Sequence, residues 1–172
     1  DDSDFPKRLL QLYDPPTVLY VLGKFSGIDE EPVVTVIGTR KASEYSLAVT
    51  RQLSMDLAKT GCTIVSGCAV GVDAQAHRAA LEAGGKTIAV LACGLNINYP
   101  AENGKLKRVI LNSGGALVSE YPPGTTVTPR TFPVRNRLMS ALSVGVLIVQ
   151  APIRSGTLLT AEHALNQGKE LY

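Results

Sequence analysis

The sequence predicts an α/β protein in which helices cover both faces of a mostly parallel β-sheet. Two observations carry this prediction. Short apolar runs, typical of buried strands, recur along the chain, and between them lie longer segments whose apolar residues repeat at helical spacing. Strands that are covered on both faces read as continuous apolar runs, and parallel strands are usually joined by helices. The pattern therefore favours a doubly wound, Rossmann-like sheet.

The expected elements follow one another from Pro32 onward. Glycine ends several of the helical segments, as is common after the last helical residue. Strands are predicted at Val33–Ile37, Cys62–Val65, Thr87–Leu91, Ala116–Val118, Val144–Val149 and Lys169–Tyr172. Helices are predicted at Ser46–Thr60, Val72–Ala83, Glu102–Asn112, Pro133–Leu142 and Thr157–Gln167. In such a fold a ligand binds beyond the carboxyl ends of the strands.

The chain divides into a lead-in segment, residues 1–31, and a main domain, residues 32–172, whose C-terminal end we expect to be truncated. The lead-in contains a short amphipathic helix near Lys7–Tyr13, a turn at Asp14-Pro15-Pro16 and an apolar segment at Val18–Val21. At 172 residues the whole chain is long enough to bury one full core.

Charge is unevenly distributed between the two parts. The net charge of +2 combines three basic and seven acidic residues in 1–31 with fourteen basic and eight acidic residues in 32–172. The basic excess therefore belongs to the main domain, which suits a polyanionic partner. The sequence has no apolar run of membrane-spanning length and no secretory signal, so a cytoplasmic protein is expected.

The cysteines also favour a cytoplasmic protein. The three cysteines lack paired spacing, which argues against a disulfide framework, and no cysteine–histidine cluster indicates a metal site. Cys62 and Cys93 flank apolar runs and are expected to be small core residues. Cys68 lies in a glycine-rich loop, where it is either a core residue or a reactive thiol.

Glycine-bearing or basic loops follow the predicted strands. The first is Gly38-Thr39-Arg40-Lys41, the second runs from Ser66 to Asp73, and the last is Arg154-Ser155-Gly156-Thr157. Free backbone amides at helix starts favour anions, and glycine lets a ligand approach the backbone closely. Ordinary tight turns and helix caps are the alternative interpretation. For Asp73, a first-turn acid that hydrogen-bonds His77 is expected rather than a ligand contact.

The segment from Tyr121 to Ala161 contains no acidic residue. Within it, Phe132 and Asn136 accompany a cluster of arginines, and nothing nearby in the sequence balances their charge. Guanidinium groups match phosphate oxygens, and an aromatic ring can stack on a base. A solvated basic surface is the alternative. The four arginines are Arg130, Arg135, Arg137 and Arg154.

Six short sequence blocks, which include the loops above, together resemble the DprA/Smf family, the DNA-processing proteins of bacterial natural transformation. The resemblance covers essentially the whole chain. It differs from the usual family pattern at Ser46, Cys68 and Gln150. The matching blocks are residues 36–43 (VIGTRKAS), 66–77 (SGCAVGVDAQAH), 98–100 with Asn103, 119–124 (SEYPPG), 132–137 (FPVRNR) and 154–157 (RSGT).

The resemblance implies a sequence-independent single-stranded DNA-binding protein that protects incoming DNA and loads the RecA recombinase. It also implies a homodimer, and neither catalytic nor cofactor chemistry. Carried onto this chain, it puts Arg40, Gly67, Ala69, Arg130, Phe132, Arg135, Asn136, Arg137, Ser155 and Gly156 around the DNA. With the loop residues Gly38, Thr39, Lys41, Cys68 and Thr157, these form the predicted DNA-binding set.

Three other functions are considered. A nucleotide phosphoribohydrolase would need a carboxylate close after its glycine-threonine loop, but Glu162 lies five residues beyond Thr157. A nicotinamide oxidoreductase would need a GxGxxG fingerprint and an acidic residue for the ribose, and the sequence has neither. A pure protein scaffold would leave the arginine cluster without a role.

Overall fold

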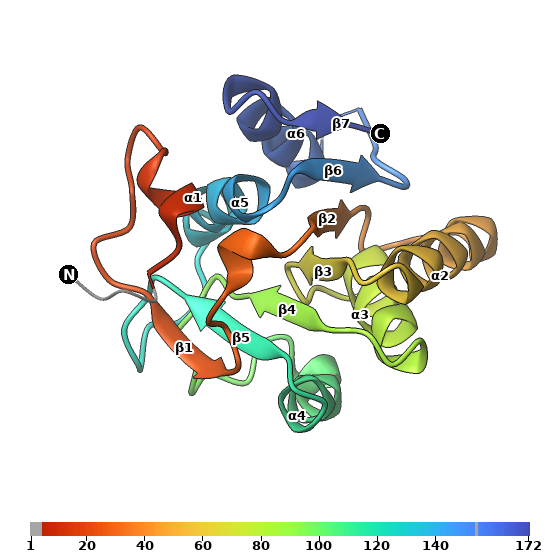
Figure 1. Cartoon of the computed structure of the whole chain (residues 1–172), viewed down its shortest axis with the longest axis horizontal. Coiled ribbons are helices and arrows are strands. Elements are labelled where there is room, and N and C mark those ends of the chain that lie inside the picture. The colour runs from red at the N-terminus through yellow and green to blue at the C-terminus, as the bar shows by residue number, and fades with distance from the viewer. Residues whose placement is uncertain (1–4, 154) are drawn as a thin grey trace.

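The computed structural model describes residues 5–153 and 155–172, so Arg154 and the acidic start lie outside the described residues. Its core is a seven-stranded sheet in the order β1-β5-β4-β3-β2-β6-β7 (Figure 1). All strand pairs are parallel except β1 with β5. The predicted fold class is thereby confirmed. The strands are β1 (Tyr20–Gly23), β2 (Val33–Ile37), β3 (Thr63–Ser66), β4 (Thr87–Val90), β5 (Ala116–Ser119), β6 (Gly145–Ile148) and β7 (Glu170–Leu171).

Helices flank the sheet on two sides (Figure 1). From β2 to β5 the chain steps along the sheet in one direction, and from β6 to β7 it steps in the other. Because parallel crossovers are right-handed, the two series of helices lie on opposite faces. One face carries α2 (Glu44–Lys59), α3 (Val72–Glu82) and α4 (Gly104–Asn112); the other carries α1 (Lys7–Leu10), α5 (Thr131–Leu142) and α6 (Gly156–Asn166), and two 3₁₀ turns lie at Ile28–Glu30 and Ala101–Asn103.

The lead-in segment is part of the same core. Its strand β1 pairs with the edge of β5, and Leu9, Phe25 and Ile28 are buried with residues of the sheet and α5. The Arg8 guanidinium fastens this segment by donating hydrogen bonds to the carbonyl oxygens of Leu142, Asp29 and Glu31, at 2.8, 2.7 and 2.9 Å. The lead-in therefore supplies the edge strand β1 of the sheet.

Local capping explains where two helices begin. Helix α2 begins at Glu44, two residues earlier than predicted, because the Ser43 hydroxyl accepts a hydrogen bond from the Ser46 amide at 3.2 Å. Helix α5 begins at Thr131 rather than Pro133. Proline is tolerated in the first turn, where its missing N–H has no partner to lose. Phe132 therefore sits on a helix and not in the preceding loop.

The predicted hydrogen bond between Asp73 and His77 is wrong. His77 is fully buried, and its Nδ1 lies 2.7 Å from Thr87 Oγ1. That hydroxyl donates to the Ile64 carbonyl, so Nδ1 carries the proton and the ring is neutral. Burial, aided by the charges of Arg135 and Arg78, lowers the pKa of His77 to about 3. This histidine therefore holds α3 against β4.

We expect His77 to make the fold sensitive to acid. Its pKa is about 3 when folded and near 6.5 when unfolded, so the unfolded chain binds more protons between these values. The free energy of unfolding should then fall by about 1.4 kcal/mol per pH unit as the pH drops through this window. Urea unfolding from pH 8 to pH 4 tests this, with His77→Gln as the matched variant. Equal pH dependence in both proteins would contradict the prediction.

Candidate nucleic-acid interface

A cleft of about 650 Å³ opens where the winding of the sheet reverses. Strands β2 and β6 are neighbours, but the loops that follow them lead to helices on opposite faces. Ligands of doubly wound proteins bind at such a switch point. The loops after β2 and β6 form two walls of the cleft, and the first turns of α5 form the third. Eleven residues of the predicted DNA-binding set line the cleft: Gly38, Thr39, Arg40, Lys41, Ala69, Phe132, Arg135, Asn136, Ser155, Gly156 and Thr157.

The loop after β2 is held from both sides. The Thr39 amide donates to the Gln150 carbonyl at 2.8 Å, and the Thr39 carbonyl accepts from the Val72 amide at 3.3 Å. The Gln150 side chain also accepts from the Ser43 amide at 3.1 Å. Sequence reasoning noted Gln150 only as a departure from the family pattern. Its role depends on the pairing of β2 with β6, which no local signal in the sequence encodes.

The exposed Arg40 and the half-buried Phe132 lie together at the rim of the cleft. The Arg40 guanidinium carbon lies 5.0 Å from the centroid of the Phe132 ring, which is within cation–π range. Tyr99 completes the group: its hydroxyl lies 3.4 Å from Arg40 Nη1, and its ring centroid lies 6.0 Å from that of Phe132. The structure shows that Tyr99 belongs to an aromatic pair beside a cation.

Arg135 lines the floor of the cleft, but its guanidinium is bound by the protein itself. Its side chain is buried, and its guanidinium donates to the carbonyl oxygens of Gly67 (2.9 Å) and Val90 and to the Asn136 side chain (3.1 Å). A Cβ atom at Gly67 would lie 2.3 Å from Arg135 Nη1. Glycine at this position thus makes room for a guanidinium of the protein. Asn136 in turn donates to the Gly156 carbonyl at 3.3 Å and joins α5 to α6.

Asp73 and Cys68 share this buried layer. Asp73 accepts a hydrogen bond from the Ala69 amide at 3.3 Å; burial raises its pKa, and the nearby Arg135 opposes that rise. Cys68 is fully buried and has a φ of 55°, which favours glycine. Burial raises its pKa to about 11, so the thiol stays protonated at neutral pH. These properties fit a packing role for Cys68, and they argue against the reactive thiol considered above.

Arg137 faces away from the cleft. It forms an ion pair with Glu120, both side chains being only 13% exposed, and it lines a second cavity on the other side of α5. The expectation that nothing balances the arginine cluster was therefore wrong, because Glu120 lies just outside the acid-free segment. Arg130 is exposed immediately before α5. Gly67 and Cys68 lie below the cleft floor.

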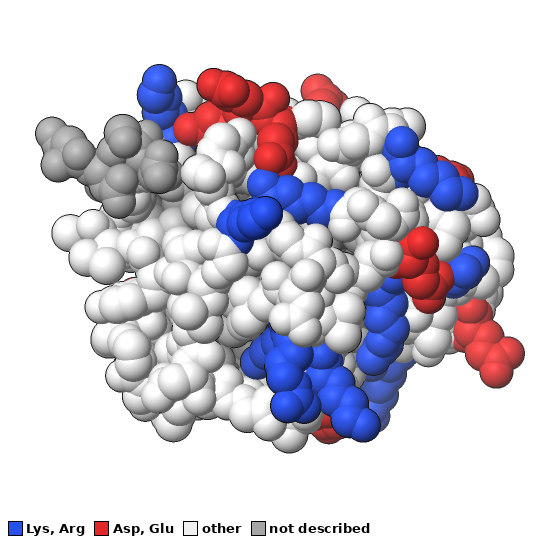
Figure 2. Space-filling model, turned by 60° about the horizontal axis from the view of Figure 1, so that its bottom comes forward, with Lys and Arg blue, Asp and Glu red and all other residues white. Residues whose placement is uncertain are grey.

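The surface charge is consistent with basic residues that do not all gather at one site. On the face shown in Figure 2, basic side chains form several separate groups among uncharged surface and some acidic side chains, with no single continuous band. In the described part of the chain, no three or more metal-ligating side chains cluster. Nor is any helix there long and apolar enough to cross a bilayer.

Comparison with known proteins decides the family. The model of the family described as DNA recombination-mediator protein A matches residues 1–172. The chain belongs to the DprA/Smf family. Its residues are 44% identical to protein Smf of Escherichia coli over 99% of this chain and 46% of that protein. The identity to DprA of Bacillus subtilis is 39%, over 99% of this chain and 57% of that protein.

Solved DprA structures share the fold. The crystal structure of Streptococcus pneumoniae DprA superimposes with a TM-score of 0.91 at 37% identity, covering 99% of this chain and 59% of that one. A Helicobacter pylori DprA structure, described for its single-stranded DNA binding mode, gives 0.90 at 39% identity and covers 96% and 75%. The chain thus spans about half the length of the curated DprA and Smf proteins it matches. A molybdenum cofactor binding protein from Rippkaea orientalis, 22% identical with a TM-score of 0.61, shares the fold alone.

Proposed function

We propose that this chain captures single-stranded DNA without regard to sequence, in the cleft between the loops after β2 and β6. The observation that carries the proposal is the Arg40–Phe132 pair beside Tyr99. A guanidinium next to half-buried aromatic rings offers one group for a phosphate and another for a base. Every base has a face that can stack, so this mode of binding is tolerant of sequence. The H. pylori relative, described as binding single-stranded DNA, supports it.

Strand selectivity follows from the same arrangement. Bases can reach the Phe132 ring only when they are unstacked from a duplex, and the cleft is bounded on three sides by loops and by α5. A duplex keeps its bases paired and presents only phosphates. We therefore expect single strands to bind more tightly than duplexes of the same length.

The wider role is proposed from the family. We infer that the protein protects incoming DNA during transformation, acts in the cytoplasm, forms a homodimer and loads the RecA recombinase onto the bound strand, without catalysing a reaction. The relatives named as DNA-processing proteins support a role in DNA processing. Loading would be tested by the rate at which RecA displaces a single-strand-binding protein when this chain is added.

Fluorescence anisotropy with labelled oligo-dT and a matched duplex tests the capture of DNA. Base–aromatic stacking contributes about 1–3 kcal/mol, so Phe132→Ala should weaken oligo-dT binding about 10-fold to 100-fold. Phe132→Tyr keeps a ring and should bind nearly as the wild type does. Arg40→Ala should also lose affinity, whereas Arg108→Ala, which removes an exposed arginine on α4, should not.

Two results would contradict the site. One is wild-type affinity in the Phe132→Ala and Arg40→Ala proteins. The other is an equal loss of affinity in Arg108→Ala, which would mean that binding depends on total charge. Urea unfolding of each variant ensures that a loss of binding is not a loss of fold.

A further inference from the structure

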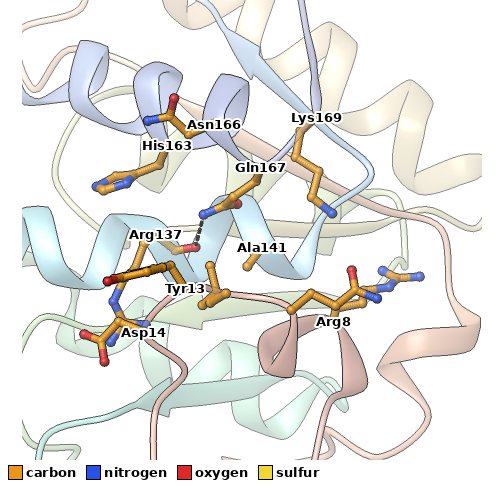
Figure 3. A pocket seen from close by; sticks show the side chains of 11 residues that line it. Arg8, Tyr13, Asp14, Arg137, Ala141, His163, Asn166, Gln167 and Lys169 are labelled. Carbon is orange, nitrogen blue, oxygen red and sulfur yellow. Dashed lines mark hydrogen bonds between the residues drawn. The ribbon is translucent and has the colours of Figure 1, made fainter.

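A second cavity lies on the opposite side of α5 from the cleft. Its volume is about 680 Å³, which is within the range of small-molecule sites. Three segments that are distant in the sequence build it: the lead-in from Arg8 to Asp14, the later turns of α5, and the end of α6 with the residues leading into β7 (Figure 3). None of the predicted DNA-binding residues except Arg137 lines it.

Lys169 provides a cation at one end of this cavity. Its side chain extends from the segment before β7 toward the side where Arg8 lies (Figure 3). Within residues 5–153 and 155–172, no carboxylate lies within ion-pair distance of its ammonium group. Arg8 cannot serve as a free cation because backbone carbonyls occupy its guanidinium. Partial burial, together with the charge of Arg8, lowers the pKa of Lys169. An anion beside this ammonium would relieve both effects.

Polar groups without partners lie along the wall between the two ends. Gln167 donates to the Arg137 carbonyl at 3.2 Å, but its buried Oε1 has no partner in the described part of the chain. Arg137 Nη1 is likewise buried and, among the described residues, unbonded. Buried polar atoms are rarely left unsatisfied in folded proteins. Both atoms are buried beneath the cavity wall, so a polar ligand reaches them only if the Gln167 or Arg137 side chain turns toward it.

The other end of the cavity is aromatic and acidic. Tyr13 and Asp14 lie there beside Arg137, with His163 across from them on α6 (Figure 3). The Tyr13 side chain is fully exposed, so its ring face is free to stack. The Asp14 carboxylate would accept hydrogen bonds from an amino group and repel a phosphate. The cavity is therefore polarised, with an anion-binding end and an end that suits an aminated ring.

We propose that this cavity binds a free nucleotide, with its phosphates at Lys169 and its base stacked on Tyr13. The amino group of adenine would face Asp14, which makes adenosine diphosphate the fitting probe. This site is separate from the DNA cleft and does not depend on the function proposed for it. Bound nucleotide would join the lead-in to α5 and α6, and it would raise the stability of the fold by mass action.

Isothermal titration with adenosine diphosphate tests the site. We expect saturable binding that weakens at least 10-fold in Lys169→Ala and in Tyr13→Ala, and that is retained in Lys169→Arg and Tyr13→Phe. Lys105→Ala, which removes an exposed lysine on α4, is the charge control and should bind as the wild type does. Inosine diphosphate lacks the exocyclic amino group and should bind more weakly than the adenosine compound.

Phe132→Ala separates the two sites, because it should lose oligo-dT and keep adenosine diphosphate. Loss of both ligands in that variant would place the nucleotide in the DNA cleft and overturn the proposal. Displacement of the nucleotide by oligo-dT from the Phe132→Ala protein would assign the cavity to a further nucleotide of the strand. If inorganic phosphate binds as tightly as adenosine diphosphate, the base does not contribute and the stacking on Tyr13 is wrong. If adenosine diphosphate shows no saturable binding, the whole proposal is refuted.

Discussion

Replacing Arg135 by methionine should destabilise the fold by about 4 kcal/mol, within the range measured when one partner of a buried charge pair is removed. The change would leave the Gly67 and Val90 carbonyls without their donor and the buried Asp73 without the cation that lowers its pKa. Methionine fills much of the same space, so the loss comes from charge and hydrogen bonds more than from volume. Urea unfolding at pH 8 measures it.

The pH dependence of this loss identifies its cause. Arg135 holds the pKa of Asp73 down against burial, so the variant should show a higher Asp73 pKa in the folded state. A folded protein that binds an extra proton gains stability as the pH falls. The difference between wild type and Arg135→Met should therefore be smaller at pH 5 than at pH 8. The exposed Arg130→Met is the matched control. A difference that does not change with pH would assign the loss to packing.

Replacing Gly71 by alanine should both destabilise the protein and abolish oligo-dT binding. Gly71 has a φ of 84°, and a Cβ atom there would lie 2.4 Å from the Thr39 carbonyl oxygen and 2.8 Å from that of Arg40. Both are backbone atoms, so the loop after β2 must move. With a ψ of −129° Gly71 lies outside the left-handed helical well, in backbone space that essentially only glycine adopts. Strain of about 1–3 kcal/mol therefore adds to the steric overlap, giving about 3 kcal/mol or more in total.

Gly61→Ala is the matched control for Gly71→Ala. Gly61 has a φ of 88°, but nothing lies within 4 Å of a Cβ atom placed there. This variant places an alanine at positive φ without the overlap, so it should lose about 1–2 kcal/mol and bind DNA normally. Equal unfolding energies for the two variants, or normal binding by Gly71→Ala, would mean that the Arg40 loop tolerates displacement.

The fold and the place of the cleft could be predicted from the sequence. Apolar runs such as Val33–Ile37 are confirmed as central strands, and parallel topology brings the loops after them to one edge of the sheet. Helix starts were less accurate, because the Ser43 cap and the position of Pro133 within a first turn are set by local hydrogen bonds. The antiparallel pairing of the lead-in with β5 depends on contacts that are remote in sequence.

The directions of Arg135 and Arg137 could not be predicted from the spacing of the motif alone, and helix geometry explains why. Arg135 and Arg137 are two positions apart on α5, which turns them about 200° from one another. They therefore point to different sides of the helix. Phe132 and Asn136 are four positions apart and share the face that lines the cleft. The partners Asp73 and Glu120 could not be foreseen, since Asp73 lies in the first turn of α3 and Glu120 follows β5.

Because Arg135 and Arg137 are bound inside the protein, we expect salt to weaken the proposed DNA binding less than it would with five free cations. Of the basic residues predicted around the strand, Arg40, Lys41 and Arg130 form no ion pair within the described residues. Each phosphate that such a group neutralises releases condensed counterions, with a slope of about −0.7 per phosphate on single strands. Three contacts correspond to a slope near −2, in place of about −3.5 for five. We therefore expect the affinity for a single strand to fall about 100-fold for a tenfold rise in salt, and not about 3000-fold.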